Sequence, residues 1–319
     1  MGFELISIIA PTRIHVSLLS LHENAERKYG GFGFAINKAI KVSAQRHSSV
    51  EIVDRSGKLK DDDVQKIKDS LILAVAGKGV RVWVDSMPGP HLGFGTGTSL
   101  SLSVIESALL ALGENYDEKR LIALSGRGRT SGVGIETYFR GGAVFDIGVK
   151  SGPGFFPSSS NLNAGDVAKN IFRCNFPDWR IEILLMRGVT GLSGGKERLF
   201  FEKVLPLSPL YSYKALYKAV MGLIPSCIDG DLGLFQTSIA DFQEMEWKRA
   251  EIQSLGRGFE DVFSSLKGDV PCIGMSSMGP LLYCVNSWEK PTIKINAEKY
   301  GFCYELVEPN NHGRVISHA

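Results

Sequence analysis

Residues 88–113 decide the fold and read PGPHLGFGTGTSLSLSVIESALLALG. Glycines at three alternate positions, Gly93, Gly95 and Gly97, allow the backbone to approach a ligand without clashes of Cβ atoms. About four turns of apolar helix follow this loop and end at Gly113. The free N–H groups at the start of the helix, together with its dipole, favour an anion in front of the loop. The stretch therefore predicts a phosphate-cradling loop.

Three hydroxyl side chains of the same loop, Thr96, Thr98 and Ser99, add hydrogen-bond donors or a ligand for a phosphate-bound Mg²⁺. The loop is not a Walker motif, because no Gly-Lys-Ser/Thr follows it. Its glycine spacing also differs from that of a dinucleotide-binding fingerprint, and no early βαβ unit precedes it. A helix start with small residues for packing is the alternative interpretation.

A second glycine-rich stretch, residues 126–134, reads GRGRTSGVG. Arg127 and Arg129 stand there among four glycines and two hydroxyl residues. Arginine binds phosphate or carboxylate through two parallel hydrogen bonds, so the stretch favours a polyanionic ligand. A surface loop with solvated arginines is the alternative.

Several other polar residues are candidates for a site. Arg13 and His15 alternate with apolar neighbours in an expected strand, so they share one face, although His15 can equally be a half-buried histidine with satisfied hydrogen bonds. Asp146 lies in an apolar strand and needs a partner or a metal. Lys196 and Glu197 follow two glycines and predict an exposed turn. The sequence shows no Ser–His–Asp order, no metal-type His/Cys cluster and no Cys–His pair.

Composition limits the compartment and the partners. The chain has 319 residues and a net charge of +2, without a basic run, which argues against nucleic acid as the main ligand. Its five cysteines form no Cys-x-x-Cys pair, so free thiols in a reducing cytoplasm are expected. No segment approaches the length of a membrane span. We therefore expect a cytoplasmic protein that binds neither nucleic acid nor membranes.

Hydrophobic patterns along the chain predict a mixture of strands and helices without strict βαβ alternation, which favours an α+β fold. Expected strands lie at residues 5–9, 13–19, 35–44, 50–53, 80–84, at the end of 126–149, and at 180–186, 272–275, 281–285 and 303–307, with a glycine turn at 30–33. Besides the helix after the loop, expected helices lie at residues 61–76, 118–124, 210–224 and 232–256. The Pro-, Gly- and Ser-rich residues 151–165 predict a linker, and we divide the chain into domains 1–155 and 156–319.

The chain resembles the GHMP kinase superfamily, because residues 88–108 are similar to its Pro-x-x-x-Gly-Leu-Gly-Ser-Ser loop and helix. Within that superfamily it is most similar to the β-ribofuranosylaminobenzene 5′-phosphate synthase family. The matching stretches, in family order, are PTRIHVSLLSL (11–21), GGFGFAI (30–36), HLGFGTGTSLSLSV (91–104), GRGRTSGVGIETYFRGG (126–142), GLSGGKE (191–197), GMSSMGP (274–280) and PNNHGRV (309–315). The resemblance implies a two-domain α+β fold of GHMP type. In that fold, an N-terminal β-α domain carries the phosphate loop, and the C-terminal domain is a ferredoxin-like α/β sandwich.

The resemblance also implies an activity. Members of the family are decarboxylating phosphoribosyl transferases that condense phosphoribosyl pyrophosphate with a para-substituted benzoate, either 4-aminobenzoate or 4-hydroxybenzoate. Carbon dioxide and pyrophosphate leave, and Mg²⁺ helps the diphosphate to depart. The reaction is an early step in the biosynthesis of methanopterin-type cofactors. Small-molecule substrates are therefore the expected partners, with a homodimer as one possible assembly.

The same resemblance implies roles for residues of this chain. Residues implied to be catalytic are Arg13, His15, Arg27 and Arg127. Residues implied to bind phosphate are Gly93, Gly95, Thr96, Gly97, Thr98, Ser99, Arg129, Ser131, Ser276 and Ser277. The candidate metal ligands are Thr98 and Asp146.

Two features keep other functions open. Many GHMP kinases carry an aspartate base where this chain has Gly134, which weighs against an ATP-dependent small-molecule kinase without excluding one. The chain also departs from the synthase pattern, with Ser20 and Tyr29 in place of acids, Met275 and Met278 in place of Gln and Trp, and no histidine at Val149–Lys150. A non-catalytic ligand-binding paralogue is therefore a third hypothesis.

Overall fold

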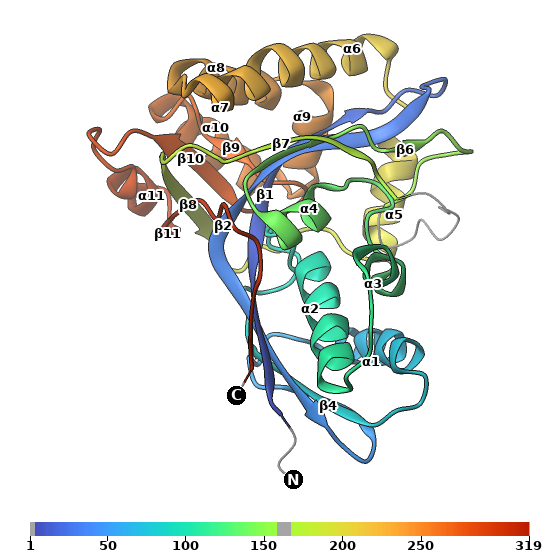
Figure 1. Cartoon of the computed structure of the whole chain (residues 1–319). Coiled ribbons are helices and arrows are strands. Elements are labelled where there is room, and N and C mark those ends of the chain that lie inside the picture. Colours follow the sequence, from blue (N-terminus) through green and yellow to red (C-terminus); the bar gives the residue numbers. More distant parts are fainter. Residues whose placement is uncertain (1–3, 158–166, 319) are drawn as a thin grey trace.

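The computed structural model describes residues 4–157 and 167–318, which form two sheets with helices packed against them (Figure 1). The strands are β1 (Ile6–Ser20), β2 (Arg27–Arg46), β3 (Val50–Asp54), β4 (Val80–Ser86), β5 (Ala143–Asp146), β6 (Val149–Lys150), β7 (Asn170–Cys174), β8 (Arg180–Met186), β9 (Gly274–Met275), β10 (Leu282–Asn286), β11 (Phe302–Val307) and β12 (Val315–His318). The helices are α1 (Asp61–Val75), α2 (Thr96–Ala111), α3 (Glu118–Ser125), α4 (Val133–Arg140), α5 (Gly195–Val204), α6 (Pro209–Lys218), the π-helix η1 (Ala219–Leu223), α7 (Ile224–Asp229), α8 (Leu232–Gln243), α9 (Glu246–Ser254), α10 (Arg257–Asp269) and α11 (Lys294–Lys299). Within the described ranges, none of the helices has the length and apolar character of a membrane span.

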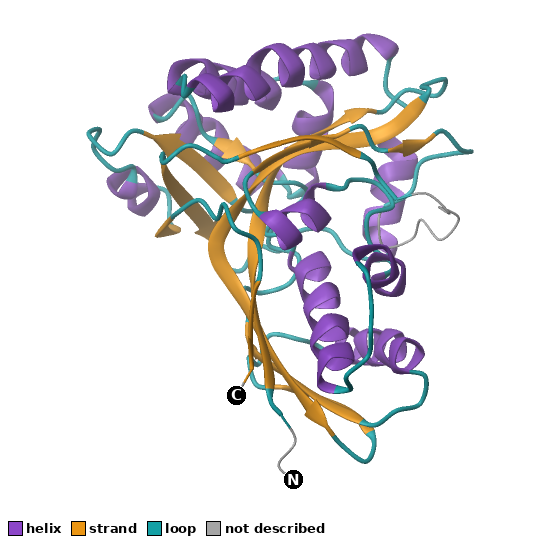
Figure 2. Cartoon of the chain, in the orientation of Figure 1, coloured by secondary structure: helices purple, strands orange, loops and turns teal. Residues whose placement is uncertain are grey.

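The long antiparallel hairpin of β1 and β2 forms the centre of the larger sheet, whose main path runs β12-β1-β2-β4-β3 (Figure 2). β5 and β6 pair with other parts of β2, and β7 pairs with β5. β1 is one strand, so the two short strands expected on either side of Pro11 are wrong. The register of β1 against β2 shifts between Ala10 and Thr12, and this irregularity accommodates a residue that has no N–H.

Three glycines expected to form a turn, at positions 30, 31 and 33, lie inside β2. A Cβ atom on Gly31 would lie 2.4 Å from Nε2 of His15, and one on Gly33 would lie 2.3 Å from the carbonyl oxygen of Ile14. The prediction of a turn is therefore wrong for a physical reason: these glycines allow β1 and its side chains to approach β2 closely.

The helix predicted after the glycine-rich loop is confirmed as α2. Its N-cap is Gly95, which has a φ of 70°, a backbone conformation that glycine adopts without strain. Leu102, Val104 and Ile105 are buried, since α2 packs against the hairpin and against neighbouring helices. The loop is therefore held at the end of a helix embedded in the core.

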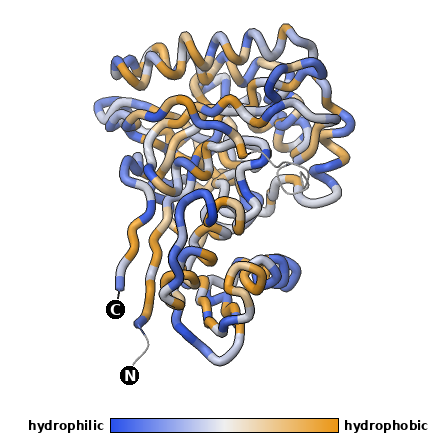
Figure 3. The backbone as a smooth tube through the Cα atoms, turned by 45° about the vertical axis from the view of Figure 1, so that its right-hand side comes forward, coloured by the Kyte–Doolittle hydropathy of each residue, from blue (hydrophilic) through white to orange (hydrophobic). Residues whose placement is uncertain are grey.

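The C-terminal part contains a four-stranded antiparallel sheet in the order β11-β8-β10-β9. Figure 3 shows hydrophilic and hydrophobic residues following one another closely along the helical parts of the tube, as expected for helices with one face on a core. The helix expected at 210–224 does not stop at Pro225: the backbone stays helical from η1 into α7, and the proline follows the π-helical turn. The helix expected at 232–256 is divided at residues 244–245.

Some elements were not expected at all: α4, α5, α10, α11, β7 and β12. Lys196 and Glu197, expected in an exposed turn, lie in the first turn of α5.

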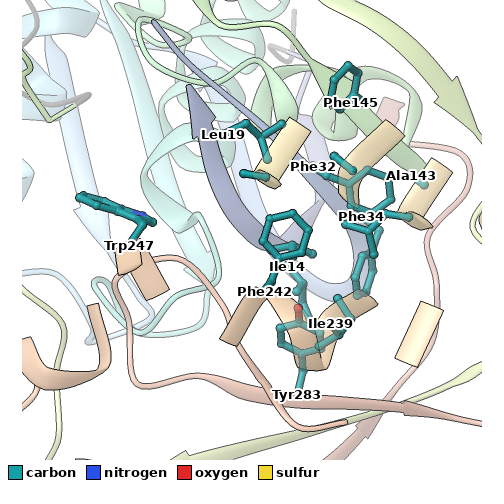
Figure 4. Close-up of a cluster of buried hydrophobic side chains, with 14 of the residues drawn as sticks. Ile14, Leu19, Phe32, Phe34, Ala143, Phe145, Ile239, Phe242, Trp247 and Tyr283 are labelled. Atoms are coloured by element: carbon teal, nitrogen blue, oxygen red, sulfur yellow. The ribbon is translucent and has the colours of Figure 1, made fainter. Parts of the chain in front are cut away.

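An aromatic core joins the two sheets. The ring of Phe34 in β2 stacks on Phe176 with the centroids 4.1 Å apart, and Phe235 and Tyr283 contact Phe34 edge-on. Figure 4 shows Phe32 and Phe34 of the hairpin beside Ile239, Phe242 and Tyr283 of the C-terminal part. Stacked and edge-to-face rings stabilise such a core beyond the area they bury.

The predicted division between residues 155 and 156 falls between β6 and β7. Part of the predicted linker, residues 158–165, lies outside the described residues. β7 and β12 follow the division in sequence, but they pair with β5 and β1 of the larger sheet. The larger sheet therefore takes strands from both sides of the division, which stays a prediction, as does the ferredoxin-like description of the C-terminal part.

Candidate functional site

The glycine-rich loop at the start of α2 alternates between open and buried positions. Gly93, Gly95 and Gly97 are partly exposed, whereas the side chains of Thr96 and Ser99 are buried. Ser99 Oγ donates a hydrogen bond of 2.8 Å to the carbonyl of Pro11 and so fastens the helix to β1. The backbone of the glycines, rather than the hydroxyl of Ser99, is thus the part of the loop that an anion can reach.

Two guanidinium groups lie directly on this loop. A Cβ atom on Gly95 would be 2.7 Å from Cζ of Arg13, and one on Gly97 would be 2.7 Å from Nη2 of Arg127. Arg13 Nη1 also donates to the carbonyl of Gly93 at 2.7 Å. Burial lowers the pKa of Arg13 to about 10, which is well above neutral pH, so Arg13 stays positively charged. Burial also lowers the pKa of Arg127.

A hydrogen-bonded chain connects His15, Ser131 and Asp146. His15 Nε2 lies 3.1 Å from Ser131 Oγ, and Ser131 Oγ donates to Asp146 Oδ2 at 2.7 Å. Because the serine proton goes to the aspartate, we assign the imidazole proton to Nε2, which leaves Nδ1 as the acceptor of the ring. The histidine stands at one end of the chain, whereas a nucleophilic triad has it in the middle.

Burial and charge set the protonation of this chain. Burial lowers the pKa of His15 well below its usual value, and the positive charges of Arg13 and Lys248 lower it further. His15 is therefore neutral at pH 7. Burial raises the pKa of Asp146 to about 6, against the hydrogen bonds from Ser131 and from the Gly148 N–H.

The candidate metal ligands do not form a ready magnesium site. Asp146 is fully buried, and its two oxygens already accept from Ser131 Oγ and from the Gly148 N–H. Thr98 lies at the start of α2, against Gly134. In residues 4–157 and 167–318, no group of three His, Cys, Asp or Glu side chains has the arrangement of a metal site. These residues do not fit a resident Mg²⁺, and we derive no step through one.

Ser276 and Ser277 from the C-terminal part close the site. Ser276 Oγ accepts from the backbone N–H of His15 at 3.0 Å and donates to the carbonyl of Gly93 at 2.8 Å. The Ser277 N–H donates to the carbonyl of His15 at 2.9 Å. The two serines thus connect β1 with the phosphate loop through hydrogen bonds that they have already formed.

Two predicted site residues have their described contacts elsewhere. Arg27 donates to the carbonyls of Ile147 and Gly148 at 2.9 and 2.6 Å, which ties it to the turn after Asp146 rather than to the loop. Nη2 of Arg129 lies 3.9 Å from the Cβ position of Gly126, at the end of α3. Their assigned roles stay predictions.

The positions that depart from the synthase pattern also have structural contacts. Ser20 Oγ donates to the carbonyl of Arg27, and Tyr29 Oη accepts from the N–H of Phe156, both at 2.7 Å. Met275 and Met278 are buried in the apolar core beside the serine pair.

A buried ion pair on α9 escaped the sequence reasoning. Lys248 and Glu251 are buried and their charged groups lie 2.5 Å apart, with Lys248 Nζ 3.3 Å from the carbonyl of Ser277. The local sequence WKRAEIQ gives no signal beyond two charged residues one helical turn apart, which are ordinarily a solvated pair.

Position 134, where many GHMP kinases carry a base, faces the phosphate loop. A Cβ atom on Gly134 would lie 3.3 Å from Cβ of Thr98 in the first turn of α2. The structure thus places a hydrogen, and no carboxylate, at that point.

Comparison with known proteins identifies relatives that cover most of the chain. No protein-family model matches the chain. The chain is 30% identical over 304 residues to the β-ribofuranosylphenol 5′-phosphate synthase of Methanothermobacter thermautotrophicus, with 91% of each chain covered. It is 29% identical to the enzyme of the same name from Archaeoglobus fulgidus over 88% of each chain, and 28% identical to that of Methanocaldococcus jannaschii over 97% of this chain and 99% of the relative.

Solved structures resemble the whole chain as well. Homoserine kinase from Cytophaga hutchinsonii aligns with a TM-score of 0.66 at 16% identity, over 99% of this chain and 98% of that one. Mevalonate-3-kinase from Thermoplasma acidophilum aligns with a TM-score of 0.63 at 13% identity, over 99% and 98%. At these sequence identities, the similarity shows a shared fold and nothing about function. Given the 30% identity over 91% of both chains, the chain belongs to the β-ribofuranosylphenol 5′-phosphate synthase family and has the fold of GHMP-type kinases.

Proposed function

We propose that the protein condenses phosphoribosyl pyrophosphate with 4-hydroxybenzoate to give β-ribofuranosylphenol 5′-phosphate, carbon dioxide and pyrophosphate. The observation that carries the proposal is the pair of partly buried guanidinium groups, Arg13 and Arg127, lying on the partly exposed glycines of a helix N-terminus. Such a seat suits a diphosphate. The relatives' name specifies a phenol product, which favours the hydroxybenzoate over 4-aminobenzoate as acceptor.

The reaction balances without an oxidant. The ring carbon that carries the carboxylate forms a bond to C1 of the ribose, and the bond from C1 to pyrophosphate breaks with its electron pair on the leaving oxygen. The ring–carboxylate bond then breaks, its electron pair restores the aromatic ring, and carbon dioxide leaves. Mg²⁺ would arrive with the diphosphate of the substrate and neutralise part of its charge.

The protein supplies charge at the leaving group. The loop amides and the guanidinium groups of Arg13 and Arg127 would hold the diphosphate and stabilise the negative charge that develops as it departs. Arg13 is held by its hydrogen bond to the Gly93 carbonyl, and Arg127 by its hydrogen bond to Ser101 Oγ. The two guanidinium groups therefore need little reorganisation as the diphosphate departs.

His15 is the residue we assign to the acceptor. It follows Arg13 by two residues on the same face of β1, which places it about 7 Å from Arg13 along the strand. As a neutral imidazole held through Nε2 by Ser131, it would accept a hydrogen bond from the phenol hydroxyl at Nδ1. That bond would orient the ring over the sugar and increase electron density at the attacking carbon.

The test is a reaction with carboxyl-labelled 4-hydroxybenzoate, phosphoribosyl pyrophosphate and Mg²⁺. We expect labelled carbon dioxide and pyrophosphate in equal amounts, with slower turnover of 4-aminobenzoate. Absence of carbon dioxide release with both benzoates would refute the proposal. ADP formation from ATP in the presence of a small metabolite would favour the kinase instead, although Gly134 offers no base at the usual position. We place this activity in methanopterin-type cofactor biosynthesis in the cytoplasm.

A further inference from the structure

The buried pair Lys248–Glu251 lies directly behind the site. Both residues are at most 3% exposed at their side chains, and Lys248 Nζ is 2.5 Å from Glu251 Oε2. Replacing a buried ion pair of this kind by apolar residues often leaves stability unchanged or improves it, so stability alone is a weak reason for its presence.

Lys248 holds one side of an unusual backbone position. Ser277 has a φ of +52°, in the left-handed region that costs a non-glycine residue about 1 kcal/mol. Its carbonyl lies 3.3 Å from Lys248 Nζ, and its N–H donates to the carbonyl of His15 at 2.9 Å. Lys248 therefore holds the backbone carbonyl of Ser277, and His15 of β1 holds its backbone N–H.

The segment that Ser277 belongs to braces the phosphate loop. Ser276 Oγ donates to the Gly93 carbonyl, and Gly279 lies so close that a Cβ atom there would be 2.2 Å from the N atom of Gly93. The Leu281 N–H donates to the carbonyl of Leu92 at 3.0 Å. A shift of Ser277 would consequently move the backbone from which the loop glycines start.

The charges around Lys248 also favour an anion in the site. Glu251 attracts both Lys248 and Arg13, so the buried lysine and the partly buried arginine share this counter-ion. A bound anion would offset the remaining positive charge, which is otherwise costly in a buried place.

We propose that Lys248, with Glu251 as its buried counter-ion, is a positioning residue of the phosphate site that fixes Ser277 and thereby the loop at Gly93–Gly97. The inference rests on the proposed function in that the loop binds a diphosphate, but it does not require the synthase reaction. Inorganic pyrophosphate, titrated calorimetrically, is therefore the probe.

The decisive variant is the double substitution Lys248→Met/Glu251→Met, which removes the pair without leaving one charge unpaired. We expect its melting temperature to stay within about 4 °C of the wild type. We expect its Kd for pyrophosphate to rise at least tenfold. A double variant that binds pyrophosphate within twofold of the wild type overturns the proposal. The control is Lys294→Met/Glu298→Met, which removes an exposed Lys–Glu pair on α11 and should leave both quantities unchanged.

A second variant, Lys248→Arg, keeps the charge and a donor for the Ser277 carbonyl. We expect its Kd to stay within threefold of the wild type, even if the double variant melts too low to titrate. An arginine variant that melts like the wild type but binds tenfold more weakly overturns the proposal. Wild-type protein that binds pyrophosphate but releases no carbon dioxide refutes the synthase reaction alone, whereas wild-type protein that does not bind millimolar pyrophosphate refutes both.

Discussion

Three glycines make room for three charged or polar side chains of the candidate site. Gly31 faces His15, Gly95 faces Arg13 and Gly97 faces Arg127, and an added Cβ atom would lie between 2.4 and 2.7 Å from each partner. The absence of a side chain at these positions therefore determines where the functional groups lie.

Gly97→Ala separates function from stability at the residue scale. Gly97 is the second residue of α2 and needs no positive φ, so alanine should stabilise the helix by up to about 1 kcal/mol. The new methyl group would displace the guanidinium of Arg127. We expect the KM for phosphoribosyl pyrophosphate to rise about tenfold, measured by initial rates. Gly258→Ala is the control, because Gly258 is the second residue of α10 and has no neighbour within 4 Å of its Cβ position. Equal KM values for the two variants would contradict the placement of Arg127.

Asp146→Asn tests the buried hydrogen-bonded chain. Burial raises the pKa of Asp146 to about 6 in the folded protein. Between pH 4 and pH 6 the unfolded chain has therefore lost this proton while the folded chain still holds it. As the pH rises through this range, the free energy of unfolding of the wild type falls by up to about 3 kcal/mol. Below pH 4 both states are protonated and the effect vanishes. We expect asparagine to flatten this part of the profile of unfolding free energy against pH and to lower kcat by disturbing Ser131. Parallel profiles for the two proteins would show that Asp146 titrates normally.

At the scale of elements, the N-cap of α2 can be tested by Gly95→Val. Gly95 has a φ of 70°, and its Cβ position is 2.7 Å from the Arg13 guanidinium, so valine would strain the backbone and displace the arginine. We expect loss of pyrophosphate binding in calorimetry. Gly256→Val provides the control, because Gly256 is the N-cap of α10 with a φ of 94° and no neighbour at its Cβ position. It should cost similar stability and retain binding; retention by Gly95→Val as well would exclude the loop as the seat of the diphosphate.

Local pattern was sufficient for elements that carry a clear signal. Apolar residues spaced three and four apart after a cluster of aspartates predicted α1, and the apolar run at Arg180–Met186 predicted β8 with the same bounds. Local sequence pattern failed to predict elements whose structure depends on contacts with residues far away in the sequence. Gly31 and Gly33 look like a turn until His15 and Ile14 are packed against them, and α10 has apolar residues that only the smaller sheet explains.

The candidate site shows the same limit. The two glycine-rich stretches, Arg13, His15 and the serine pair could be named from the sequence, because glycine spacing and family order mark them. Lys248 could not, since its role depends on α9 packing against the segment at Ser277, far away in sequence. Ser131 and Asp146 were named separately, and only the fold joins them to His15.

At the scale of the whole molecule, a cluster around the buried carboxylate of Glu106 connects the C-terminal part of the chain to α2. Arg314, just before β12, donates two hydrogen bonds of 2.6 Å to Glu106 in the middle of α2, and Tyr116 and Tyr138 donate to the same carboxylate. The C-terminal strand thus supports the helix that presents the phosphate loop.

Arg314→Met would leave the Glu106 carboxylate buried without its cation. We expect a loss of about 3–5 kcal/mol in the free energy of unfolding, measured by urea denaturation. Arg140→Met removes an exposed arginine that pairs with Glu118 and Glu136, and it should cost about 1 kcal/mol or less. Similar losses for the two variants would show that Glu106 does not depend on Arg314.

The most direct measurement of the central claim is a crystal structure with phosphoribosyl pyrophosphate or pyrophosphate bound. The account predicts the diphosphate at Gly93–Ser99, within hydrogen-bond distance of the amides at the start of α2 and of the guanidinium groups of Arg13 and Arg127, with the ribose directed toward His15. A diphosphate bound at any other face of the protein, with this loop covered by side chains, would contradict it.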